Sequence, residues 1–198
     1  MTAPGKLLAL RRVAGQPDEL TDEALVASCA LGDQAAMGAL IDRFHRPLYR
    51  FVSRLLGSDG NDRDDVVQAT FAEIAGCAAR FRRDSSVRVW IFGIAANISK
   101  NQIRTLSRRR RMETALAAVP SPRATRPDDE AQRNQLLRKL ATALADLPHD
   151  LRTAFVMCDL EDLTARDAAA ALGVREGTVW RRVHDARRAL REALEGTS

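Results

Sequence analysis

Three prolines, Pro120, Pro122 and Pro127, fall within eight residues near the middle of this 198-residue chain. Proline has no backbone N–H to donate and its ring clashes with the preceding helical turn, so no continuous helix can cross this segment. The Ser, Ala, Thr and Arg residues around the prolines, and the acidic residues 128–130 after them, are typical of a linker. The sequence therefore predicts two lobes joined by a flexible linker over residues 113–131.

Apolar residues recur every three or four positions on both sides of this linker, which is the spacing of an amphipathic helix. Four helices are predicted between Thr21 and about Arg111, with Thr21 and Asp33 as the N-caps of the first two. Pro47 predicts a kink or a break near His45. The clearest stripes are Ile41, Phe44, Leu48, Phe51 and Leu55, then Val67, Phe71, Ile74, Ala78 and Phe81, and beyond the linker Leu136, Leu140, Leu144 and Leu147. Runs of β-branched residues are short. The sequence thus predicts an all-α protein with a flexible arm at 1–20, a helical bundle at 21–112 and a second small helical domain at 132–198.

The formal net charge is +5, and only three of the 31 basic residues, Lys6, Lys100 and Lys139, are lysines. Arginine presents a planar fork of donors that matches phosphates and guanine edges, so the charge suggests a polyanionic partner. A GC-rich genome, whose codons favour arginine and alanine, would give the same excess. Charge by itself therefore does not identify the partner.

The cysteines and histidines are few and scattered along the chain: Cys29, Cys77, Cys158, His45, His149 and His184. A structural metal site or a disulfide framework needs clustered pairs of such residues. No run approaches the ~20 apolar residues of a membrane span, and the N-terminus lacks the apolar core of a signal peptide. We therefore expect a cytoplasmic protein with no membrane insertion, no metal and no cofactor.

Residues 148–194 carry the pattern of a helix-turn-helix. Pro148 begins a helix, and Thr164 can cap a second, short one. The residues predicted to be buried in the first of these are Leu151, Phe155 and Leu160. Gly173 then tolerates the positive φ of a tight turn. The long helix that follows has an apolar face made of Val179, Val183, Ala186, Leu190 and Leu194.

In DNA-binding proteins the second helix of this motif enters the major groove with its N-terminus first. The outward face of the predicted helix carries Trp180, Arg181, His184, Arg187 and Arg188. Arginine can bond guanine O6 and N7 together, and neighbouring arginines can hold phosphates. The alternative is a helical hairpin with a solvated arginine face. The small residues, the placed glycine and the arginines together favour the DNA-binding motif.

Several stretches of the chain resemble sigma-70-type transcription factors. Residues 65–71, Asp-Val-Val-Gln-Ala-Thr-Phe, are similar to the D-L-V-Q-E-x-F signature, and residues 81–97 are similar to the F-R-x-x-S and W-L-x-x-I-A-x-N patterns of regions 2.3 and 2.4. Segments 147–148, 172–174 and 177–179 resemble region 4. The resemblance covers 22–112 and 132–194, and the absence of an intermediate domain fits the extracytoplasmic-function subgroup.

This resemblance implies a transcription initiation factor with no catalytic residue, which binds RNA polymerase core, selects promoters and assists promoter melting. The implied partners are the β′ clamp and β flap of the polymerase, promoter DNA and an anti-sigma factor. The residues implied in core binding are Asp64, Asp65, Gln68 and Phe71, and the spacing predicts that Asp65 and Gln68 lie outside the stripe of Val67, Phe71 and Ile74. Those implied in contacts with the −10 element are Arg82, Arg83, Ser85, Ser86, Arg88, Trp90, Asn97, Lys100 and Asn101. Those implied in contacts with the −35 element are Thr178, Trp180, Arg181, Arg182, His184, Arg187 and Arg188.

Some of these residues have a second interpretation. Large aromatic side chains on a helical stripe usually pack in the core, which applies to Phe71, Phe81 and Trp90. The run Arg108–Arg111 either complements the helix dipole or contacts phosphates of the promoter spacer. Trp180 and Asp185 stand where family members commonly have other residues, so the −35 sequence cannot be transferred from the family.

Two other classes of function are a stand-alone DNA-binding regulator and an enzyme. A stand-alone helix-turn-helix regulator accounts for the second lobe but leaves the motifs of the first unexplained, and co-purification with core polymerase separates the two. An enzyme needs a nucleophile, an acid–base pair or a metal set, and the chain has no phosphate loop and no clustered His or Cys. Asp62, Asp64 and Asp65 are better explained as acids at the start of a helix.

Overall fold

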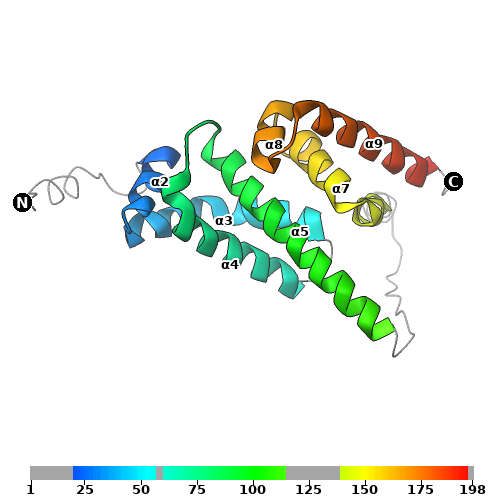
Figure 1. Ribbon diagram of the computed structural model, residues 1–198, viewed down its shortest axis with the longest axis horizontal. Helices are drawn as coiled ribbons and strands as arrows, with labels where there is room; N and C mark the ends of the chain where they lie inside the picture. Colours follow the sequence, from blue (N-terminus) through cyan, green and yellow to red (C-terminus); the bar gives the residue numbers. More distant parts are fainter. Residues whose placement is uncertain (1–19, 57–59, 115–138, 196–198) are drawn as a thin grey trace, which may run out of the picture.

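The computed structural model describes residues 20–56, 60–114 and 139–195, and most of these are helical (Figure 1). The elements are α2 (Asp22–Ala30), α3 (Gln34–Leu56), α4 (Gly60–Cys77), the 3₁₀ turn η2 (Ala78–Arg80), α5 (Val87–Thr114), a helix over 139–146, α7 (His149–Phe155), the π-helical turn η3 (Val156–Leu160), α8 (Ala165–Leu172) and α9 (Glu176–Glu195). These ranges contain no strand, which confirms the all-α prediction. The predicted arm up to residue 19 and most of the predicted linker lie outside the described residues.

Side-chain caps start the first helices where the sequence predicts them. The Thr21 hydroxyl accepts a hydrogen bond from the backbone N–H of Ala24 at 3.3 Å. Asp33 Oδ1 accepts from the N–H groups of Ala35 at 2.9 Å and Ala36 at 3.2 Å, at the start of α3. Such caps satisfy N–H groups that have no partner inside the helix. Both predicted N-caps of the first lobe are therefore confirmed.

Helices α3 and α4 bury most of their predicted apolar stripes against each other and against α5. Phe51 of α3 and Phe92 of α5 stack with their ring centroids 4.3 Å apart, at the centre of the bundle. The buried stripe residues are Phe44, Leu48, Phe51, Leu55, Val67, Phe71, Ile74 and Ala78. Pro47 lies inside α3, and the helix continues on both sides of it. The helix is therefore not broken near His45. Burial of the side chains before and after Pro47 holds the helix together despite the missing N–H.

The second lobe has the predicted helix-turn-helix. The Thr164 hydroxyl accepts from the N–H of Asp167 at 3.1 Å, and Gly173 has φ of 65° between α8 and α9. The predicted apolar face of α9 is buried at Val179, Val183, Ala186 and Leu190. The prediction that Leu160 is buried is wrong, because its side chain is 37% exposed. The wider π-helical turn η3 changes the phase of the apolar pattern and buries Val156 and Met157 instead.

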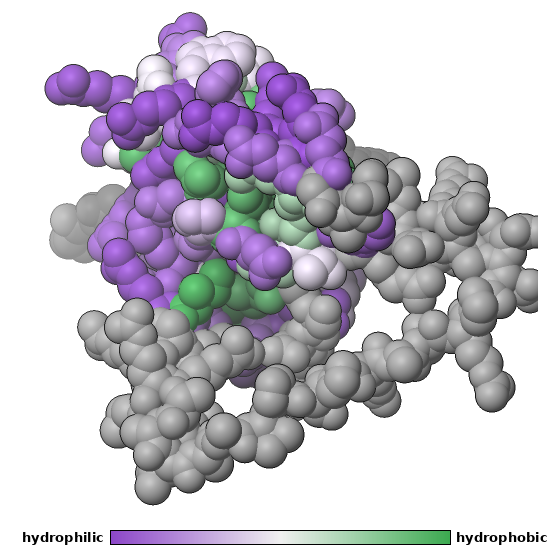
Figure 2. Space-filling model, turned by 90° about the vertical axis from the view of Figure 1, so that its right-hand side faces the viewer, coloured by the Kyte–Doolittle hydropathy of each residue, from purple (hydrophilic) through white to green (hydrophobic). Residues whose placement is uncertain are grey.

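The two lobes pack against each other, which the sequence did not predict. In Figure 1, α7 and α8 lie alongside α5, and buried residues of both lobes form one hydrophobic cluster. Figure 2 shows hydrophilic side chains over the upper part of one face of the molecule and hydrophobic side chains gathered near its middle. Within the described ranges, no helix combines the length and the hydropathy needed to cross a membrane.

Arg152 of α7 fastens the second lobe to the first. Its guanidinium is buried and donates to the backbone carbonyl of Leu55 at 2.5 Å, to that of Leu147 at 2.9 Å and to that of Ala145. The Leu55 carbonyl belongs to the last turn of α3, where carbonyls have no partner within their own helix. One side chain thus satisfies carbonyls at the ends of two helices from different lobes.

His149 also lies at this contact, and we expect it to make stability fall as the pH drops below about 6.5. Burial lowers its pKa to about 4; the Ala96 carbonyl and Asp150 favour the protonated ring, while Arg152 and Lys100 oppose it. The unfolded chain therefore takes up a proton at a higher pH than the folded protein. Each pH unit between the two pKa values removes up to about 1.4 kcal/mol of unfolding free energy.

Urea unfolding across this pH window measures the effect. His149→Gln should flatten the pH profile, whereas the control His184→Gln, at a side chain that is 76% exposed, should not change it. Equal slopes for the wild type and His149→Gln would contradict the prediction.

Candidate nucleic-acid interface

The loop over residues 81–86 presents cationic and hydroxyl side chains at the start of α5. The Ser86 hydroxyl accepts from the N–H of Val89 at 3.3 Å and so acts as a cap of α5. Arg83 has φ of 61°, a left-handed backbone conformation that is uncommon for residues other than glycine. Arg82 and Arg83 are both exposed on this loop. The cap and the turn therefore place two guanidinium groups beside the first turn of α5.

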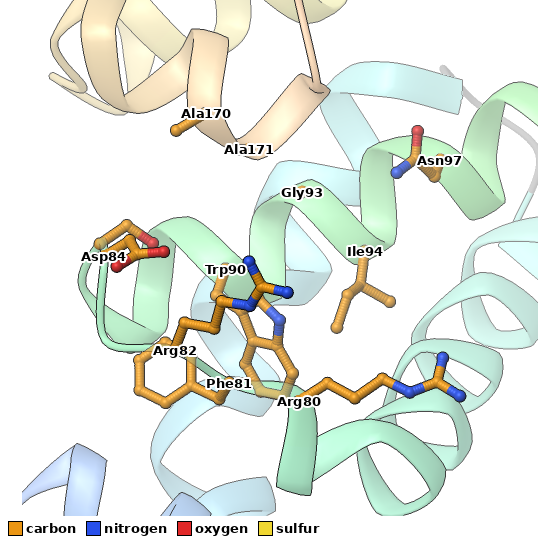
Figure 3. A pocket seen from close by; sticks show the side chains of 11 residues that line it. Arg80, Phe81, Arg82, Asp84, Trp90, Gly93, Ile94, Asn97, Ala170 and Ala171 are labelled. Atoms are coloured by element: carbon orange, nitrogen blue, oxygen red, sulfur yellow. The ribbon is translucent and has the colours of Figure 1, made fainter.

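A cavity of about 350 Å³ lies between this loop, α5 and the end of α8 (Figure 3). It is lined by Arg80, Phe81, Arg82, Asp84, Ser85, Trp90, Gly93, Ile94, Asn97, Ala170 and Ala171. Trp90 packs against Phe81 with the ring centroids 5.1 Å apart, and it is partly buried, so it both supports the core and lines the cavity. Asn97 is exposed one turn beyond Ile94. Aromatic faces, an amide and nearby cations are the groups that can hold an unstacked base.

The remaining residues predicted for the −10 element lie outside this cavity. The Arg88 guanidinium is 5.1 Å from the centroid of the Phe92 ring and pairs with Glu161 of the second lobe. Lys100 Nζ lies 3.0 Å from Asp150 Oδ1, also in the second lobe, and Asn101 is exposed on α5. The structure therefore gathers Arg82, Ser85, Trp90 and Asn97 around the cavity and turns Arg88 and Lys100 towards the other lobe.

The acidic face of α4 is accessible. Asp64, Asp65 and Gln68 are exposed, outside the stripe of Val67, Phe71 and Ile74, as the spacing predicted for Asp65 and Gln68. Phe71 is 8% exposed and packs in the core of the bundle, so its ring supports α4 rather than facing a partner. The exposed acids and amide suit a basic partner surface.

Helix α9 exposes most of the residues predicted for the −35 element. Trp180 is 57% exposed, and its indole N–H donates to Glu176 Oε1 at 3.3 Å. Arg181, His184 and Arg188 are exposed as well, and Thr178 is half-buried. These residues lie on the first four turns of α9, and the N-terminal turns are where a recognition helix meets base edges and phosphates.

Two arginines of the same set pair with acids that lie outside α9. Arg187 is exposed, and its guanidinium donates to both carboxylate oxygens of Asp159, with Nε at 3.0 Å from Oδ2. Arg182 is half-buried, and its guanidinium lies 2.9 Å from Asp150 Oδ2 at the contact between the lobes. In this arrangement Arg182 lies against α7 of its own lobe rather than on the outer surface of α9.

Sequence reasoning missed the residues that join the lobes. Glu161 is 5% exposed and pairs with both Arg54 and Arg88. Asp150 pairs with both Lys100 and Arg182. In the sequence these acids look like solvated helix residues, and no local pattern marks a partner as far away as 107 positions. In the part of the chain that the structure describes, no group of three or more His, Cys, Asp or Glu residues could hold a metal ion.

Comparison with known proteins assigns both lobes. The family description "Sigma-70 region 2" matches residues 40–109, and "Sigma-70, region 4" matches residues 137–190. The chain is 30% identical to the ECF RNA polymerase sigma-E factor of Haemophilus influenzae, over 90% of this chain and 97% of that protein. It is 35% identical to the ECF RNA polymerase sigma factor SigC of Mycobacterium tuberculosis, over 87% of this chain and 91% of that protein.

Two solved structures are also similar. CnrH in complex with the cytosolic domain of CnrY matches with a TM-score of 0.65 and 28% identity, over 89% of this chain and 99% of that one. The sigma factor RpoE of Bartonella quintana, in complex with the anti-sigma factor NepR, matches with a TM-score of 0.60 and 25% identity, over 78% of this chain and 94% of that one. The helix-turn-helix, the motifs of the first lobe and these matches agree: the chain belongs to the extracytoplasmic-function sigma factors of the sigma-70 family, which are specificity factors of transcription initiation and not enzymes.

Proposed function

We propose that this sigma factor binds RNA polymerase core in the cytoplasm through the exposed face of α4 and holds the −10 element in the cavity at the start of α5. The observation that carries the proposal is the set of side chains that the first lobe contributes to the cavity, which brings Trp90, Asn97 and Arg82 together on one side of that lobe. Asp64, Asp65 and Gln68 supply the polar face for the β′ clamp, and the second lobe is the part that meets the β flap.

Melting a promoter takes a base out of its stack, and the protein must offer a substitute surface. The Trp90 ring, packed on Phe81, is a fixed apolar plane, and the Asn97 amide can donate to and accept from a base edge. Arg82 and Arg83 are exposed beside the cavity and can hold the adjacent phosphates. These groups support recognition of a single strand rather than of a duplex.

The second lobe is proposed to read the −35 element with the N-terminal turns of α9. Trp180 and Arg181 are exposed there, with His184 and Arg188 following on the same side of the helix. The solved relatives support a further partner, because the RpoE structure contains the anti-sigma factor NepR. We propose that an anti-sigma protein binds this chain as well.

A two-variant experiment tests the proposal by separating core binding from melting. Asp65→Arg reverses a charge on the α4 face and should weaken core binding by about tenfold or more. Asn97→Ala should leave core binding and closed-complex formation nearly normal, but should lower open-complex formation about tenfold and relax the choice of one −10 base. Pull-down of core, permanganate footprinting and run-off transcription measure these steps.

A pre-melted template distinguishes the two defects. It should restore part of the transcription lost in Asn97→Ala and none of that lost in Asp65→Arg. Glu73→Arg, at another exposed acid of α4, is the matched control for charge reversal and should bind core normally. Loss of core binding or of helicity in Asn97→Ala would assign Asn97 a structural role and place the −10 pocket elsewhere.

A further inference from the structure

The second lobe covers one side of the candidate −10 cavity. Ala170 and Ala171, at the end of α8, complete its lining opposite α5 (Figure 3). The backbones are so close that a Cβ atom added at Gly93 would lie 2.7 Å from the carbonyl oxygen of Ala171 and 3.1 Å from its Cβ. Gly93 is therefore the residue that lets α8 approach α5. With the lobes in this position, no nucleic-acid strand can pass over the Gly93 face of α5.

Two carboxylates hold the lobes in this position. Glu161 is buried between Arg54 and Arg88, and Asp150 bridges Lys100 and Arg182 at 3.0 Å and 2.9 Å. Three of these four cations, Arg88, Lys100 and Arg182, belong to the set implied in DNA binding. Each carboxylate thus contacts cations that would otherwise be available to phosphate oxygens, because carboxylate and phosphate oxygens both accept charge-assisted hydrogen bonds from guanidinium and ammonium groups.

We propose that Glu161 and Asp150 act as internal substitutes for DNA phosphates and hold the free protein in a closed state that cannot load the −10 strand. The inference rests on the proposed function of the cavity. Promoter DNA and the second lobe then compete for the same side of α5. The apparent affinity of the free protein for the −10 strand is then the affinity of the open state multiplied by the fraction of molecules that are open.

The ion pairs are of a kind that can be exchanged for phosphates. The Arg54 and Lys100 side chains are each 37% exposed, and that of Arg88 is 41% exposed, so solvent and ions reach the cations at the edge of the contact. Burial of Asp150 opposes its ionisation, but the hydrogen bond from Lys100 and the charge of Arg182 outweigh it and lower the pKa of Asp150. Asp150 is therefore ionised wherever it would have to compete with a phosphate.

The full-length protein with a fluorophore pair, introduced as unnatural amino acids at exposed residues Ala72 and Arg191, reports the separation of the lobes. The combined variant Glu161→Gln with Asp150→Asn removes both charges and keeps the side-chain shapes. We expect it to increase the separation of the lobes. We also expect the free protein to bind a single-stranded −10 oligonucleotide, taken from a promoter that the holoenzyme melts, about tenfold more tightly.

Two further variants serve as controls for the change in charge and for a failure of the combined variant to fold. Ala171→Met places a larger side chain against Gly93 and should open the lobes with the same gain in affinity, although no charge changes. Glu73→Gln removes one exposed acid remote from the contact, and neither the separation nor the affinity should change. If the combined variant does not fold, Ala171→Met decides the question alone.

The outcomes are distinct. Wider separation with tighter oligonucleotide binding, in the combined variant or in Ala171→Met but not in Glu73→Gln, supports the closed state. Separation of the lobes without tighter oligonucleotide binding overturns it. So does a wild-type protein whose lobes are already separated, and so does an equal gain in affinity in Glu73→Gln. Adding Asn97→Ala to the opened protein separates this inference from the proposed function. If the −10 assignment is wrong, that change leaves oligonucleotide binding unaltered.

Discussion

Replacing Arg152 by methionine is expected to lower the free energy of unfolding by about 3 kcal/mol. Methionine retains most of the apolar volume but none of the donors, so the carbonyls of Leu55, Ala145 and Leu147 lose the partner that they share. A buried carbonyl left without a hydrogen bond costs about 1–3 kcal/mol. The loss is below the sum for three carbonyls because water can reach those at the edge of the contact.

Urea unfolding followed by circular dichroism measures this effect. Arg166→Met is the matched control, since Arg166 is exposed on α8, and it should change stability by no more than about 0.5 kcal/mol. Arg152→Met should also increase the separation of the lobes, because the Leu55 carbonyl and Arg152 belong to different lobes. Equal stability of the two variants would show that the guanidinium does not fasten the lobes.

Replacing Arg181 by alanine is expected to weaken recognition of the −35 element by about 1–3 kcal/mol, if its guanidinium reads a base. Arg181 is exposed near the start of α9, where a recognition helix meets base edges. A contact with a base edge differs from a contact with a phosphate in one measurable way. Losing the base contact should reduce discrimination at a single base pair, whereas losing a phosphate contact weakens all sequences alike.

The measurement uses the reconstituted holoenzyme and a promoter that the wild-type holoenzyme selects from a randomised library. Binding of Arg181→Ala is compared on this promoter and on its single-base variants in the −35 element. Arg191→Ala removes the same charge from the same helix, about 15 Å from Arg181 at the rise of an α-helix, and should leave base choice intact. Unchanged discrimination in Arg181→Ala would assign Arg181 to a phosphate or to no contact.

The sequence by itself determined the elements and the family of this protein, because the signals for both are local. Thr21, Asp33 and Thr164 cap helices from positions three or fewer residues away, and the apolar spacing of α3, α4 and α9 specifies which face is buried. The exposure of Asp65 and Gln68 followed from the same spacing. The prediction that Leu160 is buried was wrong for a local reason too. A π-helical turn rotates the helix face on which Leu160 lies relative to the regular α-helical spacing that the prediction assumed.

Only the tertiary structure decided how the lobes meet. Arg152 and Leu55 are 97 positions apart, and Arg88 and Glu161 are 73 apart, so no pattern within a helix could pair them. In the sequence, Glu161 and Asp150 are acids among many, and Gly93 interrupts a helix without a visible reason. Their roles depend on which backbone lies opposite. Glu161 is buried because the first lobe lies opposite it, and there its carboxylate pairs with Arg54 and Arg88. At Gly93, α8 lies so close that the position has room for a hydrogen atom but not for a Cβ atom.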